Sequence, residues 1–175
     1  DGFLFKYKTE IENLIGYWAE KIEEGNVMNF IPFQAISVSL MTGDRRNNFW
    51  CGCGTTLRVV DIDGRFYLCD ELMDRPEYRI DEETRLDPKE WSALTLSEQC
   101  RKCEVRGICA GRCLHTLLDC PPERNQVYCE STKILIEAVK SKIPALRKNL
   151  EQGTIRWEQL RNPTILDGFP PEIIP

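Results

Sequence analysis

Residues 100–113 read CRKCEVRGICAGRC, which places four cysteines in the spacing C-x2-C-x5-C-x3-C. A two-residue gap lets a tight loop direct two thiolates at one metal centre. The longer gaps allow the chain to wrap a cluster or to pass to a second one, as in ferredoxin-type runs, whose last cysteine serves another cluster. Gly107 and Gly111 permit close backbone approach where this loop must turn. The stretch therefore predicts metal or cluster ligation.

A β-hairpin is expected just before this run. We predict strands over Thr55–Asp61 and Arg65–Cys69, because β-branched and aromatic residues flank the turn signal Asp63-Gly64. Two cysteines precede the first strand and one ends the second strand. Formation of the hairpin would therefore bring these three thiols near one another. These are the cysteines at positions 51, 53 and 69.

The chain holds nine cysteines in 175 residues, and their number and setting bear on the choice between disulfides and metal. The count is odd, no secretory signal precedes them, and pairs as close as Cys51/Cys53 and Cys100/Cys103 gain little as structural disulfides. Zinc remains an alternative, since two four-cysteine zinc sites would also use eight cysteines. The spacings in the run favour iron–sulfur clusters over zinc.

The flanks of this region read as helices. Apolar residues recur at helical spacing from about Tyr7 to Glu24, again after Pro32, and from Asn125 to Glu151, where Pro144 predicts a bend. A short helix is expected from Asp87-Pro88, and an extended, proline-rich tail from Thr154.

The expected fold class is α+β: a small cysteine-rich hairpin and loop core flanked by N-terminal and C-terminal helices. The expected division is a helical connector at residues 1–48, a two-cluster domain at residues 49–132, and a helix and tail at residues 133–175.

Composition excludes several classes of function. The net charge of −5 argues against a nucleic-acid partner. No apolar run approaches the ~20 residues of a membrane span, and the first residues lack the features of a secretion signal. We therefore expect a cytoplasmic protein without membrane contact. Because the chain starts with Asp1, we expect it to be part of a longer protein.

The cysteine pattern resembles the SPASM domain of radical S-adenosylmethionine enzymes, which is recognised by C-x9–15-G-x4-C, the four-cysteine run and a last cysteine. Here Cys53, ten residues, Gly64, four residues and Cys69 precede the run, and fifteen residues separate Cys113 from Cys129. The match spans Cys51 to Cys129, under half of the chain.

This resemblance implies two 4Fe–4S clusters with crossed ligation. The first would be held by Cys51, Cys53, Cys69 and Cys113, and the second by Cys100, Cys103, Cys109 and Cys129.

This chain departs from the family pattern at two places. Cys51-Gly52-Cys53 is tighter than the family's usual first pair, which leaves open a three-cysteine cluster with one open iron. Cys120 has no assigned role and is taken as a plain thiol in preference to a replacement ligand.

Two further side chains close to cysteines in the sequence bear on the predicted site. His115, the only histidine, is expected to be a half-buried structural side chain. Trp50 is placed to shield a cluster from water.

The resemblance also implies what surrounds this chain. Radical S-adenosylmethionine enzymes bind S-adenosylmethionine and their catalytic cluster through C-x3-C-x2-C in a partial barrel, and that motif is absent here. The chain alone is therefore expected to be inactive. Its expected partners are that barrel, in the parent protein, and a peptide or protein substrate. Its clusters would transfer electrons or bind the substrate. The alternative is a structural zinc-binding interaction module.

Overall fold

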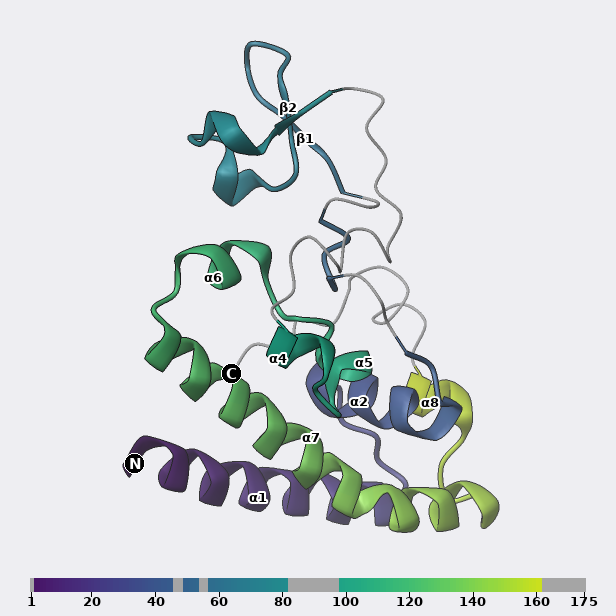
Figure 1. Ribbon diagram of the computed structural model, residues 1–175. Coiled ribbons are helices and arrows are strands. Elements are labelled where there is room, and N and C mark those ends of the chain that lie inside the picture. Colours follow the sequence, from purple (N-terminus) through teal and green to yellow (C-terminus); the bar gives the residue numbers. More distant parts are fainter. Residues whose placement is uncertain (1, 46–48, 54–56, 82–97, 162–175) are drawn as a thin grey trace. The chain divides into compact units, whose positions relative to one another are not determined.

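The computed structural model in Figure 1 describes residues 2–45, 49–53, 57–81 and 98–161. The chain forms two compact units. The first comprises residues 1–45 and 126–175, and the second comprises residues 46–125. Helices and a three-stranded antiparallel sheet confirm the predicted α+β class. The domain division expected from the sequence stays a prediction.

The first unit is helical. Helix α1 spans Gly2–Glu23, α2 spans Ile31–Thr42, α8 spans Trp157–Arg161, and most of α7 (Pro122–Glu151) belongs here. Side chains of α1 and α7 come together in this unit, where Tyr7, Ile11 and Leu135 line one pocket. The largest fully buried side chains of this unit are Ile15, Trp18, Ile22, Ile36, Ile136, Leu146, Ile155 and Leu160.

The helix boundaries predicted from the sequence agree only in part with those in the structure. Helix α1 begins before Tyr7 but ends at Glu23, next to the predicted stop. Gly25 has φ 81° and its N–H donates to the carbonyl of Ile22, so the helix closes with a left-handed residue. Helix α7 starts at Pro122, a residue suited to a first turn, and continues past Pro144.

The expectation of an extended tail is wrong for residues 157–161, which form α8. The side chain of Gln159 accepts a hydrogen bond from the N–H of Arg156, and Leu160 is fully buried. Gln34 in α2 donates to the carbonyl of Leu160, so packing against α2 overrides the local pattern. The rest of the tail and the helix expected from Asp87-Pro88 lie outside the described residues.

The second unit contains the predicted hairpin. Strand β1 (Val59–Val60) pairs antiparallel with β2 (Phe66–Tyr67), and β2 pairs with β3 (Arg79–Ile80), which was not predicted. The turn is closed by Asp61, whose carboxylate accepts hydrogen bonds from the N–H groups of Asp63 and Arg65, while Gly64 has φ 77°. The paired strands have two residues each, shorter than expected, and a 3-10 helix, η1 (Asp70–Leu72), begins directly after Cys69.

Short helices make up the rest of this unit. They are η2 (Pro76–Tyr78), α4 (Glu98–Arg101), α5 (Arg106–Cys109) and α6 (Leu114–Asp119). None of the helices in the described part of the chain has the length and apolar character needed to cross a membrane.

The core of the first unit depends on Trp18. Its side chain is fully buried, its Nε1 donates to the carbonyl of Met28 at 2.9 Å, and its ring meets Phe33 edge-on at 5.7 Å. We expect Trp18→Ala to lower the free energy of unfolding by about 3–5 kcal/mol, through lost burial and the cavity left behind. Phe5→Ala, on the same helix but 76% exposed, should change it by less than about 0.5 kcal/mol. Urea unfolding followed by circular dichroism measures the free energy of unfolding of both variants. Equal effects of the two changes would contradict the central role of Trp18 in this core.

Candidate metal centre

Four cysteines from separate segments lie close together in the second unit. The thiols of Cys51 and Cys53 share a hydrogen bond, and the charges of Cys51, Cys69 and Cys113 all act on Cys53. Cys53 is fully buried and Cys69 is 6% exposed. Both pack in an apolar cluster with Phe49, Leu72 and Leu114. The structure thus gathers the four residues that the sequence predicts as ligands of a first cluster; their ligand role stays a prediction.

Local backbone conformation explains how Cys69 and Cys113 reach this place. Both are extended, with φ −153° and −133°, and each directly precedes a helix, η1 or α6. Between Cys109 and Cys113, three successive residues have left-handed backbone: Ala110 (φ 56°), Gly111 (φ 80°) and Arg112 (φ 66°). Only the glycine adopts this conformation without strain. The reversal separates the last cysteine of the run from the other three.

The surroundings shift the pKa values of these thiols in opposite directions. The pKa of Cys51 is lowered to about 6, chiefly because the Cys53 thiol donates a hydrogen bond to its sulfur. The pKa of Cys53 is raised, through that same bond, burial and the neighbouring thiols. Burial raises the pKa of Cys69 to about 11, and the Asp70 carboxylate adds to this shift. Of Cys51, Cys53 and Cys69, Cys51 is thus the thiol that ionises first.

One side chain not predicted as part of the site, that of Asp70, lies beside it, and an ion pair elsewhere in the second unit was not predicted either. Sγ of Cys69 is 3.4 Å from Oδ1 of Asp70, and the charge of Asp70 acts on both Cys69 and Cys51. Asp70 could have been noticed because it follows Cys69 in the sequence. Arg75 forms a two-point ion pair with Asp119, with Nη1 and Oδ1 2.6 Å apart. No sequence signal links those two residues, since 44 positions separate them.

Trp50 and His115 each have a polar partner within the second unit. Trp50 is buried, and its Nε1 donates to the carbonyl of Ile108 at 2.9 Å, which ties the segment leading to Cys51 to helix α5. The His115 side chain is 39% exposed, and its Nε2 lies 3.0 Å from Oδ2 of Asp119. Cys120 is partly buried and follows the last residue of α6.

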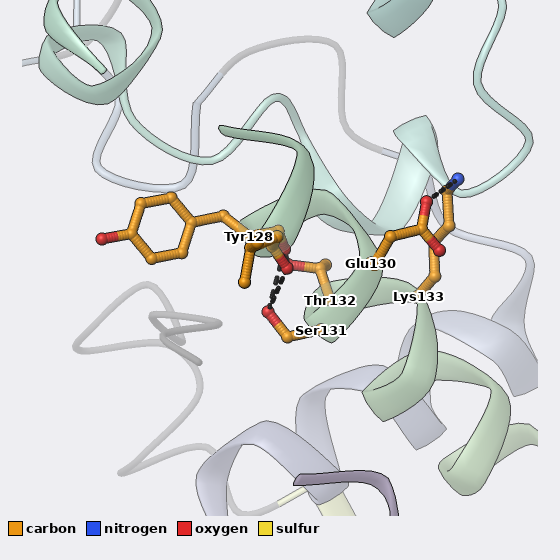
Figure 2. Close-up of polar contacts among 6 residues, drawn as sticks. Tyr128, Glu130, Ser131, Thr132 and Lys133 are labelled. Atoms are coloured by element: carbon orange, nitrogen blue, oxygen red, sulfur yellow. Dashed lines mark hydrogen bonds and ion pairs between the residues drawn. The ribbon is translucent and has the colours of Figure 1, made fainter. Parts of the chain in front are cut away.

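The second predicted ligand set draws on both units. Cys100, Cys103 and Cys109 belong to the second unit, and Cys129 lies on α7 in the first. The N–H of Cys103 donates to the carbonyl of Cys100, which closes the two-residue loop between them. Cys129 follows Tyr128 in α7, and Figure 2 shows this part of the helix, where the hydroxyls of Ser131 and Thr132 both donate to the carbonyl of Tyr128. This ligand set stays a prediction.

The four gathered thiols suit a soft, thiolate-binding metal group. In the described part of the chain, no group of three or more Cys, His, Asp or Glu side chains is arranged around a single ion. An iron–sulfur cluster spreads its thiolates over several irons, so it accepts a wider arrangement than one ion does. Four thiols, two of them in apolar surroundings, fit such a cluster.

Comparison with known proteins gives a distant relationship. Over an alignment of 158 residues, the chain is 24% identical to a cysteine-type anaerobic sulfatase-maturating enzyme of Clostridium perfringens strain 13, and 23% identical to the enzyme of strain ATCC 13124. The chain is a distant relative of these enzymes. Each alignment covers 83% of this chain but 42% of the relative, so the chain spans about two fifths of their length. No family model and no solved structure matches the chain.

The thiol pair of Cys51 and Cys53 gives a pH-dependent prediction for reduced, metal-free protein. Because the thiolate is the nucleophile, alkylation of Cys51 by iodoacetamide should accelerate as the pH rises through about 6. Cys53→Ala removes the donor and should move this midpoint up, toward the ordinary value of 9.0. Mass spectrometry of alkylated peptides across pH measures the midpoint. An unmoved midpoint in the variant would show that Cys53 does not stabilise the thiolate.

Proposed function

We propose that this chain is the auxiliary iron–sulfur domain of a radical S-adenosylmethionine enzyme that modifies a side chain of a protein or peptide. The observation that carries the proposal is the gathering of Cys51, Cys53, Cys69 and Cys113, which lie up to 62 positions apart in the sequence (113 − 51). Without a metal, the buried thiols stay protonated, because burial and neighbouring thiolates disfavour their ionisation. A shared cluster would bind all four as thiolates, because the positive charge of the irons stabilises them.

These four residues would hold the first 4Fe–4S cluster. Cys100, Cys103, Cys109 and Cys129 would hold the second. Such a cluster takes up and gives back one electron, at a potential set by its coordination, hydrogen bonds and exposure to solvent. Phe49, Leu72 and Leu114 supply an apolar wall on the side of Cys53 and Cys69. Trp50, buried and held by Ile108, would limit the access of water.

The relatives support the identity of the substrate class. Their name describes enzymes that mature sulfatases, so their substrate is a protein. By analogy, the parent of this chain would act on a protein or peptide in the cytoplasm, where thiols remain reduced. S-adenosylmethionine and its catalytic cluster would be bound by a barrel outside this sequence. This chain would supply electron transfer, substrate contact or both.

Anaerobic reconstitution tests the proposal. Iron and sulfide analysis should find about eight irons per chain, with a paramagnetic signal on reduction. Cys69→Ala and Cys100→Ala should each lose about four irons, since each removes a ligand of a different cluster. Cys120→Ala is the matched control, a cysteine without an assigned role, and should keep all of them.

Two other outcomes would contradict the proposal. Two zinc ions with no uptake of iron would make the chain a structural zinc module. Loss of the same irons in Cys69→Ala and Cys100→Ala would show that the two ligand sets are not separate.

A further inference from the structure

The pocket of the first unit is apolar and open. Its volume is about 170 Å³, and it is lined by side chains of α1, α2 and α7 and of the residue before α2. Among the described residues that line it, three are aromatic and none is charged; they include Tyr7, Leu14, Phe30, Pro32 and Phe33. Such a lining suits an apolar occupant.

Exposed apolar side chains continue the pocket along α1. Leu14 is 38% exposed, Tyr17 45% and Phe3 61%, and the ring of Phe3 stacks on that of Tyr7 at 6.0 Å. At about 3.6 residues per turn, these four residues fall on one side of the helix, next to its buried stripe. A contiguous apolar surface of this kind marks a binding site.

The chain itself leads to this pocket. Helix α8 packs against α2, where the side chain of Gln34 donates to the carbonyl of Leu160 at 3.3 Å. Gln34 directly follows Phe33, which lines the pocket. Residues 162–175 follow α8 and lie outside the described residues. The segment therefore begins beside the same turn of α2 that forms a wall of the pocket.

The composition of residues 162–175 matches the pocket. The segment reads NPTILDGFPPEIIP, in which large apolar residues alternate with prolines. Proline restricts the chain before it binds, so ordering the segment costs less entropy, and proline-rich segments bind in grooves lined by aromatic side chains. Its attachment to α8 makes the binding intramolecular, which raises the effective concentration of the segment at the pocket.

The length of the segment is also sufficient. A helix with its side chains is about 10–12 Å across, and an extended chain covers about 3.3 Å per residue. About four residues beyond Arg161 are thus enough to pass around the first turn of α2. That length brings Ile165 and Leu166 to the pocket.

We propose that residues 162–175 bind in the pocket formed by α1, α2 and α7, with Ile165 and Leu166 against its aromatic lining. The chain then covers its own apolar surface, and this face of the first unit is closed to other molecules. The proposal concerns the first unit alone and does not depend on metal binding.

Photo-crosslinking of the full chain tests the proposal. The crosslinker p-benzoylphenylalanine in place of Leu14 should react with residues 162–175 of the same chain. Mass spectrometry of a mixture of isotope-labelled and unlabelled chains identifies the linked peptides and separates links within a chain from links between copies. The matched control is the same crosslinker in place of Phe5, which is 76% exposed and on the opposite side of α1, and it should not link to the segment.

A change within the segment should weaken the link. With the crosslinker at position 14, Leu166→Asp should lower its yield by about fivefold or more, because the pocket offers no polar partner in its described lining. Asn162→Asp adds the same charge next to α8 and should keep the yield. An unchanged circular dichroism spectrum shows that the helices of each variant are folded.

Three outcomes would overturn the proposal. Links between copies would make the pocket an interface between two chains. No link from position 14, or equal links from positions 14 and 5, would show that the segment does not occupy the pocket.

Discussion

The second unit depends on one constraint, which is that four thiols must share a small and partly apolar space. Cys53 and Cys69 are buried among Phe49, Leu72 and Leu114, and their neighbours Cys51 and Cys113 add further ionisable sulfur. Burial disfavours every thiolate, and each thiolate disfavours the next. The hydrogen bond between the Cys51 and Cys53 thiols lowers the pKa of Cys51 and raises that of Cys53, so one thiolate and one thiol can lie side by side. Under the proposed function, a cluster would stabilise all four sulfurs as thiolates.

The surrounding structure holds the segments that deliver these thiols. The Asp61–Arg65 turn closes the hairpin, which brings Cys69 close to Cys53. The left-handed residues from Ala110 to Arg112 reverse the chain before Cys113. Two longer-range contacts join the segments: Trp50 to Ile108, and Arg75 to Asp119. The second of these is partly exposed to solvent, so it orients η2 and α6 more than it stabilises them.

The sequence predicts what is governed by local rules. The hairpin follows from Asp63-Gly64, the end of α1 follows from Gly25, and the ligand candidates follow from cysteine spacing. It does not predict β3, because Arg79–Ile80 carries no strand pattern of its own and pairs only once β2 is in place. Nor does it predict α8, which is fixed by the contact of Gln34 with Leu160, 126 positions away.

The two units differ in what can make them stable. The first has long helices and a conventional apolar core around Trp18, Ile36 and Leu146. The described elements that lie wholly within the second are at most six residues long, its strands have two residues each, and its apolar cluster includes two of the cysteines. Helices and hairpins this short are not stable alone. Under the proposed function, ligation would contribute much of the folding free energy of the second unit, as in other small metal domains. The first unit needs no such contribution, because its buried side chains already form a packed interior.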